Sequence, residues 1–208
     1  MSKYLLVLSA MLMALPAVAD LSTNMGAATK QTFRGVKQSN KDFVFSAGAD
    51  YQGPLGFYAG AWGYTGSIED FDTSEVNAYG GFAFNVKDLS VGLGVIRYER
   101  AQQTGFSEYN VNLAWDAYRL STYQDEDATY QYNEIAANYN FWGTKGMAFT
   151  FGLLDQDATA DVVADEIWNY SITWVLAMPG NVDFDFGFGR HEKKGNSLTL
   201  SMSKQIDW

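Results

Sequence analysis

The chain has 208 residues and a formal net charge of −10, with 24 acidic residues against 14 lysines and arginines. This excess of negative charge disfavours nucleic acid as a partner, because basic side chains must neutralise the phosphates. Cysteine is absent, which excludes a disulfide-held secreted fold and cysteine metal sites. Aromatic residues make up 16% of the chain, a composition that suits β-strands.

The first residues, MSKYLLVLSAMLMALPAVAD, have the features of a secretory signal. Lys3 supplies the positive start, residues 4–14 are almost entirely apolar, and Ala17-Val18-Ala19 is a small-x-small cleavage motif. We therefore expect cleavage after Ala19 and a single mature domain over residues 20–208. No later segment has the ~18–20 consecutive apolar residues that a membrane helix needs.

Apolar and polar residues alternate with period two through most of the remaining chain. In SLTLSMSK, Leu198, Leu200 and Met202 fall on one face while the serines and threonine fall on the other. Strict alternation over this length predicts a strand with one apolar and one polar face. The same pattern predicts twelve strands, at 24–36, 42–51, 56–66, 74–85, 89–100, 107–115, 118–124, 129–141, 147–155, 166–177, 182–191 and 197–207.

The connections between these strands alternate between tight and wide. Tight turns are expected near Pro54, Lys87, Asp116, Gly143 and Pro179, and the wider, more polar loops fall between them. Short periplasmic turns that alternate with longer outer loops are typical of outer-membrane barrels. The sequence therefore predicts an all-β fold, a transmembrane antiparallel up-and-down β-barrel in the outer membrane of a Gram-negative bacterium.

A soluble β-sandwich is the alternative fold, because alternation alone does not say which face meets water. Sandwich strands are usually shorter than those expected here, and the regular alternation of turn lengths favours the barrel. The C-terminal Trp208 ends an alternating strand and matches the kind of signal that barrel-assembly machinery reads. The expected partners are thus that machinery and the lipid bilayer. Lys204 interrupts the apolar face near its periplasmic end, but no break in the apolar band is long enough to indicate an oligomer, so we expect a monomer.

Within such a barrel the polar faces line the lumen. The candidate pore-lining residues are Arg34, Asp50, Glu75, Asn77, Glu108, Asn110, Asp116, Glu134, Asp183, Asp185 and His191. Clustered carboxylates favour cations through their field. We expect a porin-like channel for passive diffusion of small hydrophilic solutes or ions, with a cation preference.

Two other interpretations of the lumen and loops stay open. The inward charges can instead pair with each other and close the lumen, and Arg34 can serve either as a selectivity element or as a structural tie that forks to acids. A closed barrel would act as a structural or surface-recognition protein through acidic loops such as DQDATADVVADE, residues 155–166.

An outer-membrane enzyme is the least favoured class. Hydrolysis needs a nucleophile beside a base, and the one histidine, His191, has Ser197 and Ser201 on the next strand. No G-x-S-x-G motif is present, and a lone histidine makes no metal site. We expect no catalysis, no cofactor and no metal.

Three segments resemble the TorF family of porin-like proteins. TFRGV at Thr32–Val36, followed by QSN, resembles that family's first hairpin; GFYAGAWG at Gly56–Gly63 resembles its third strand; and SLTLSMSK at Ser197–Lys204 resembles its closing strand. The resemblance implies a secreted outer-membrane barrel of this size.

Overall fold

The computed structural model describes residues 20–39, 43–68, 71–140, 146–156 and 165–208. Their backbone is almost entirely β-strand, with one short 3-10 turn at Pro54–Gly56. The strands are β1 Asp20–Ala28, β2 Thr32–Phe33, β3 Val36–Lys37, β4 Val44–Gln52, β5 Phe57–Tyr64, β6 Ser67–Ile68, β7 Phe71–Asp72, β8 Glu75–Val86, β9 Leu89–Arg100, β10 Phe106–Trp115, β11 Tyr118–Asp125, β12 Tyr130–Tyr139, β13 Gly146–Gln156, β14 Asp165–Met178, β15 Val182–His191 and β16 Gly195–Asp207.

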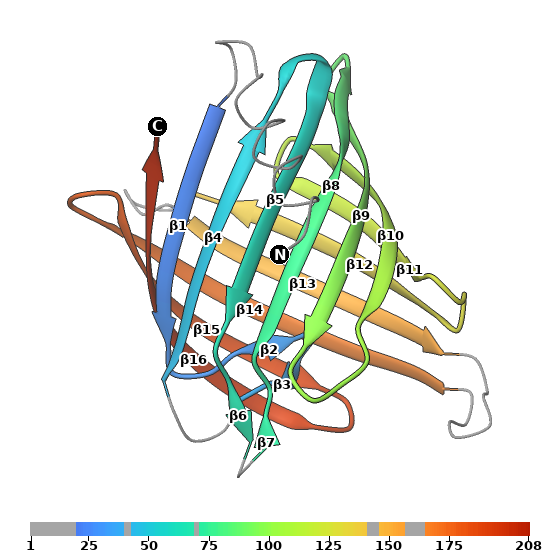
Figure 1. Ribbon diagram of the computed structural model, residues 1–208, viewed down its shortest axis with the longest axis vertical. Helices are drawn as coiled ribbons and strands as arrows, with labels where there is room; N and C mark the ends of the chain where they lie inside the picture. Colours follow the sequence, from blue (N-terminus) through green and yellow to red (C-terminus); the bar gives the residue numbers. More distant parts are fainter. Residues whose placement is uncertain (1–19, 40–42, 69–70, 141–145, 157–164) are drawn as a thin grey trace, which may run out of the picture.

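Twelve of these strands close into one antiparallel barrel in the order β1-β16-β15-β14-β13-β12-β11-β10-β9-β8-β5-β4 (Figure 1). The seam is the pairing of β1 with β16, from Ser22 opposite Asp207 to Ala28 opposite Ser201. Trp208 extends it, because its backbone N–H donates to the Leu21 carbonyl at 2.9 Å. Closure leaves no strand of the barrel with an unpaired edge, which is the condition for a β-structure in hydrocarbon.

The two ends of the barrel differ. Asp20 and Trp208 lie at one end, together with the tight turns at Pro54–Gly56, Lys87–Asp88, Asp116–Ala117 and Pro179–Asn181, and we call it the terminus end. The opposite end, called the loop end, carries the β1–β4 connection with its hairpin β2–β3 and the β5–β8 connection with its hairpin β6–β7. Figure 1 shows β6 and β7 projecting beyond the barrel rim there.

Burial in this barrel is reversed relative to a soluble protein. Large apolar side chains are exposed on the outer face of every barrel strand from β8 to β12, among them Phe82, Leu93 and Ile135. Polar side chains such as Glu75, Glu108 and Asn169 are instead buried inside. An apolar outer band around a polar interior matches lipid as the surrounding solvent.

The predicted twelve-stranded antiparallel barrel is confirmed, and the expected strand 182–191 coincides with β15. The expected strand 24–36 is wrong. Barrel strand β1 begins at Asp20 and ends at Ala28, and residues 32–37 form the separate hairpin β2–β3. The reason is local: Arg34 and Gly35 both adopt positive φ, at 50° and 79°, so the chain reverses there. In the described part of the chain, no helix has the length and hydropathy to span a membrane.

Close packing between β8 and β9 makes a specific glycine necessary. A Cβ added to the inward Gly81 would lie 2.0 Å from the Leu93 carbonyl oxygen, whereas one added to Gly92 meets nothing closer than 3.6 Å. We expect Gly81→Ala to destabilise the barrel by about 1–3 kcal/mol, because the backbone must shift. The measurement is the urea midpoint of unfolding in detergent. Gly92→Ala is the matched control, and equal midpoints for the two variants would contradict this account.

Candidate functional site

The most distinctive element of the interior is the hairpin β2–β3. Its two-residue turn is Arg34-Gly35, with Phe33 paired opposite Val36. Positive φ at both central residues is the geometry of the tightest hairpin turn, which matches the twist of the strands it joins. A non-glycine residue such as Arg34 is uncommon in this conformation, so its side chain must be held there by other contacts.

The hairpin crosses the lumen rather than lying along its own wall. It is joined to β1 and β4, which lie opposite β10–β12 in the ring of strands. Its tip nevertheless contacts that far wall, since Arg34 binds Glu108 of β10. A Cβ on Gly35 would lie 2.9 Å from Asn169 of β14 and 3.2 Å from His191 of β15. Figure 1 shows β2 and β3 within the barrel outline near the loop end.

A two-pronged ion pair holds the tip. Nη1 and Nη2 of Arg34 donate to Oε1 and Oε2 of Glu108 at 2.7 and 2.8 Å. The hydroxyls of Tyr98 and Tyr130 also donate to Glu108, at 2.9 and 2.5 Å. Glu108 is fully buried, and the Arg34 side chain is 13% exposed. A buried carboxylate is tolerated only when it is paired and hydrogen-bonded, as it is here.

Aromatic rings surround the guanidinium group. Its central carbon lies 4.2 Å from the ring centre of Tyr132, 5.1 Å from Tyr123 and 5.8 Å from Tyr130, all on the barrel wall. Phe33 of the hairpin adds a fourth ring at 4.6 Å. Such cation–π contacts stabilise a desolvated cation. Burial alone disfavours the charged form, but the Glu108 carboxylate outweighs it, so the pKa of Arg34 is raised above its ordinary value.

The tip separates two cavities of the lumen. On the side toward the terminus end lies a polar cavity of about 320 Å³, lined by Arg34, Tyr132 and the hydroxyls of β13, β14 and β16. A second cavity, of about 280 Å³, is lined by Arg34, Tyr130 and His191. Arg34 and Asn169 line both cavities, so these two side chains lie where the cavities meet.

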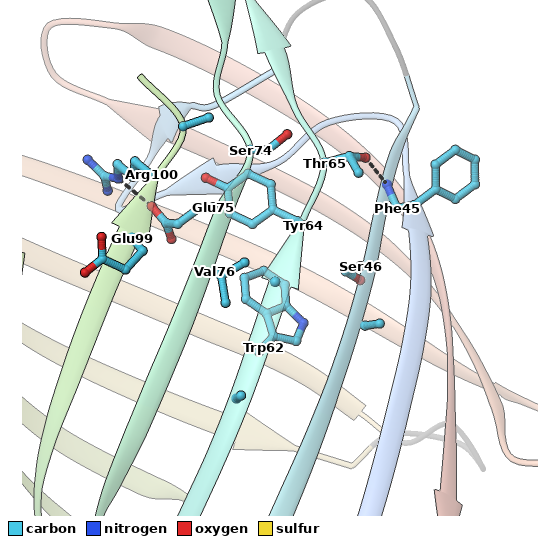
Figure 2. Close-up of a pocket in the computed structure, with 14 residues that line it drawn as sticks. Phe45, Ser46, Trp62, Tyr64, Thr65, Ser74, Glu75, Val76, Glu99 and Arg100 are labelled. Carbon is cyan, nitrogen blue, oxygen red and sulfur yellow. Dashed lines mark hydrogen bonds and ion pairs between the residues drawn. The ribbon is translucent and has the colours of Figure 1, made fainter. Parts of the chain in front are cut away.

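Two further arginines pair with inward carboxylates. Arg100 of β9 donates to Glu75 of β8, and Arg119 of β11 donates to Glu134 of β12 at 2.8 Å. Figure 2 shows Glu75 and Arg100 facing each other at the loop end, beside Tyr64. They lie in the wall of a groove of about 850 Å³. Outward-facing residues such as Phe45 and Val76 line it as well, so the groove is not confined to the lumen.

Most of the candidate lumen residues do lie on the inward face. Cross-strand register and burial place the following inside: Asp50, Glu75, Asn77, Glu108, Asn110, Glu134, Asp183, Asp185 and His191. Whether they line a conducting pore stays a prediction. Arg34 is inside as well, but it reaches the lumen from the hairpin and not from a wall strand.

The prediction that Asp116 lines the lumen is wrong. This residue lies exposed in the two-residue turn between β10 and β11, with φ of 51°, and not in the lumen. Trp115 and Tyr118 pair across that turn, which agrees with the expected strand 107–115. The assignment of Asp116 to the lumen carried the alternation one residue past the end of that strand. Aspartate is favoured at such positions because it tolerates a left-handed backbone.

Sequence reasoning missed Arg100, Arg119 and the inward tyrosines. The period-two alternation could have identified the arginines, because it places them on the inward faces of their strands. Arg100 lies opposite Glu75, and Arg119 lies opposite Ala136, which is two residues from Glu134 on the same face of β12. The tyrosines were missed because a phenol suits either face of such a wall. Their partner Glu108 shows that Tyr98 and Tyr130 act as hydrogen-bond donors.

His191 has a structural role in the loop-end turn. The backbone N–H groups of Lys193 and Lys194 donate to its Nδ1 at 3.1 and 3.2 Å. His191 is buried and lies close to Gly35 of the hairpin tip. The expected signal segment 1–19, the expected turn near Gly143, and residues 157–164 of the acidic loop lie outside the described residues.

The ion pair of the tip predicts a change in protease sensitivity. Breaking a buried pair by removing one partner costs about 3–5 kcal/mol, so Glu108→Gln should release the hairpin. We expect trypsin to cleave the variant rapidly after Lys30, Arg34 or Lys37, as read by mass spectrometry, while the wild type resists. Glu99→Gln is the control, because its pair with Arg97 is exposed. Resistance of Glu108→Gln equal to that of the wild type would show that other contacts hold the hairpin.

Known structures share this architecture at low sequence identity. The chain is similar to a structure described as the NanC porin, with 10% identity, a TM-score of 0.62, and coverage of 88% of this chain and 97% of that one. It is also similar to the KdgM porin, with 8% identity, a TM-score of 0.60, and coverage of 88% and 98%. A second KdgM structure, in complex with disordered oligogalacturonate, has 7% identity, a TM-score of 0.53, and coverage of 91% and 98%.

These likenesses show the fold, which is that of outer-membrane porins. No curated protein sequence matches the chain. A family profile described as "Bacterial protein of unknown function (Gcw_chp)" matches residues 16–174. The chain therefore belongs to the Gcw_chp family, and its barrel is built like the KdgM and NanC porins.

Proposed function

We propose that this protein is a porin-like outer-membrane channel for small hydrophilic solutes, narrowed by the hairpin β2–β3. The observation that carries the proposal is the hairpin tip inside the lumen, bound to Glu108 on the opposite wall. Twelve strands enclose more space than the eight-stranded barrels that side chains fill, and less than the wide porins. A single inserted hairpin is therefore enough to set the width of the path.

Lumen chemistry supports the passage of polar solutes. The cavity on the terminus side of the tip is lined by hydroxyls, among them Thr173, Thr199 and Ser201, and by the small residues Gly187 and Gly189. Hydroxyls replace the hydrogen bonds of a hydrated solute. Charged side chains line the same cavity, namely Arg34, Arg119, Glu134 and Asp185. Nearer the terminus end, a further cavity of about 390 Å³ is lined by polar residues such as Ser22, Asp50 and Gln205.

We also propose a cation preference. Inward carboxylates outnumber the three inward guanidinium groups described above, and each of those groups binds a glutamate. Asp50 keeps neutral partners instead, accepting hydrogen bonds from Tyr79 and from Asn24. With Asp20 and Asp207 beside the same cavity, the terminus-end mouth is negative. A negative mouth raises the local concentration of cations.

Membrane placement completes the proposal. The exposed apolar band supports insertion in lipid, and the terminus end, with its short turns, would face the periplasm. Secretion through the segment 1–19, assembly through Trp208 and a monomeric state remain part of this proposal. So does membership of the TorF family: its first-hairpin motif coincides with the hairpin β2–β3, whose place inside the lumen fits a porin.

Removal of the hairpin tests the channel. The backbone N–H of Gln38 donates to the Gln31 carbonyl at 2.8 Å, so the two ends of the hairpin are already adjacent. Replacing residues 32–37 by Asn-Gly should close the connection with a short turn. We expect a severalfold rise in single-channel conductance in planar bilayers. A correctly inserted wild type and deletion variant that both fail to conduct would overturn the channel function.

Ion selectivity tests the negative mouth. We expect the wild type to show a cation-selective reversal potential in a potassium chloride gradient, and Asp50→Asn to reduce it, because the isosteric amide can still accept the hydrogen bond from Tyr79 but loses the charge. The outward-facing Glu99→Gln serves as the control and should leave the potential unchanged. An unselective wild type, or an Asp50→Asn potential equal to that of the wild type, would argue against the preference.

A further inference from the structure

The pocket around Glu108 is assembled by the barrel wall, and the hairpin only fills it. Glu108, Tyr98, Tyr123, Tyr130 and Tyr132 all belong to strands β9–β12. Arg34 enters this pocket from a connection that starts on the far side of the ring. The wall therefore presents a buried carboxylate and several aromatic faces to whatever occupies the position of the guanidinium group.

The geometry of the pocket selects a planar, forked cation. Both carboxylate oxygens of Glu108 face the same occupant, at 2.7 and 2.8 Å from two different nitrogens. A guanidinium matches this arrangement with two parallel hydrogen bonds, whereas an ammonium is a point charge that matches one. The flat ring of Tyr132 at 4.2 Å also favours a planar group.

We propose that the Glu108 pocket is a binding site for guanidinium-bearing solutes that pass along the lumen, and that Arg34 occupies it as a built-in competitor. The proposal deepens the channel function and rests on it for the transport step, although binding itself does not require conduction. Solutes can reach the pocket from both sides, because Tyr132 lines the cavity on the terminus side and Tyr130 lines the second cavity.

Electrostatics couples occupancy to the position of the hairpin. If the tip leaves, Glu108 remains as a buried and uncompensated carboxylate, which is costly until a proton or another cation replaces Arg34. A solute cation that binds the vacated pocket therefore stabilises the undocked hairpin, and an undocked hairpin favours binding of the solute. The tethered Arg34 acts at an effective concentration in the millimolar range or above, so it outcompetes dilute solutes.

Arg34→Ala exposes the site by removing the competitor. The probe is guanidinium chloride at low millimolar concentration, compared with urea, its neutral counterpart of similar shape, and with sodium chloride. We expect guanidinium to lower the conductance of Arg34→Ala toward that of the wild type, and urea and sodium to leave it unchanged. The double variant Arg34→Ala/Glu108→Gln should need at least about tenfold more guanidinium, because a charged hydrogen-bond partner is lost.

Two controls define the site. The wild type should be insensitive at these concentrations, because Arg34 fills the pocket. Arg97→Ala should also behave as the wild type, since Arg97 faces outward and pairs with Glu99 at the surface. The assignment would be overturned if the wild type or Arg97→Ala were as sensitive to guanidinium as Arg34→Ala. It would also be overturned if the double variant were as sensitive as Arg34→Ala.

A second readout separates this site from the channel function. The unfolding temperature in detergent should rise with guanidinium for Arg34→Ala and not for the double variant, whether or not either conducts. If the protein does not conduct but the unfolding temperatures differ in this way, the channel function is refuted and the binding site stands. If the protein conducts but guanidinium does not raise the unfolding temperature of Arg34→Ala above that of the double variant, the binding site is refuted. If Arg34→Ala does not fold, Arg34→Lys replaces it, and guanidinium should then act at lower concentration than in the wild type; equal concentrations would overturn the proposal.

Discussion

Closure of the backbone hydrogen-bond ladder is the constraint on which the rest of this structure depends. A strand surrounded by lipid has no water to satisfy its peptide groups, so each must pair with a neighbour on both sides. The β1–β16 seam completes that requirement, and the hydrogen bond from Trp208 to Leu21 extends it to the last residue. The ring of strands in turn defines an inside, which lipid cannot reach and where polar side chains can be held.

That enclosed interior explains why the glutamates lie where they do. Glu75, Glu108 and Glu134 are each bound by an arginine from another segment of the chain. Such pairs contribute little net stability when both partners are present, but the loss of one leaves a costly charge. The pairs therefore act mainly to define positions. For Glu75 and Glu134 they join neighbouring strands, and for Glu108 the pair fixes the hairpin β2–β3 across the lumen.

The hairpin gives the barrel a feature that its strands do not supply. At its tip, Arg34 takes part in three features at once. It forms half of the tight turn, it makes the two-pronged ion pair with Glu108, and its guanidinium group contacts aromatic rings such as that of Tyr132. The same residue also lines two cavities of the lumen, which is the basis of the proposed channel and binding site. Structural tie and selectivity element, which the sequence left as alternatives for Arg34, are compatible roles for the same guanidinium group.

Local periodicity was enough to predict the barrel and the faces of its strands. Alternation is imposed on each strand separately by lipid on one side and the lumen on the other, so residues such as Phe184 and Asp185 reveal their faces without knowledge of any partner. The hairpin and its contacts were beyond this reasoning. TFRGV alternates as a strand would, but in the structure the chain reverses at Arg34-Gly35, where both residues adopt positive φ. The partner that holds the hairpin tip, Glu108, lies 74 positions away along the chain, and only the closed barrel brings its carboxylate within reach of the guanidinium.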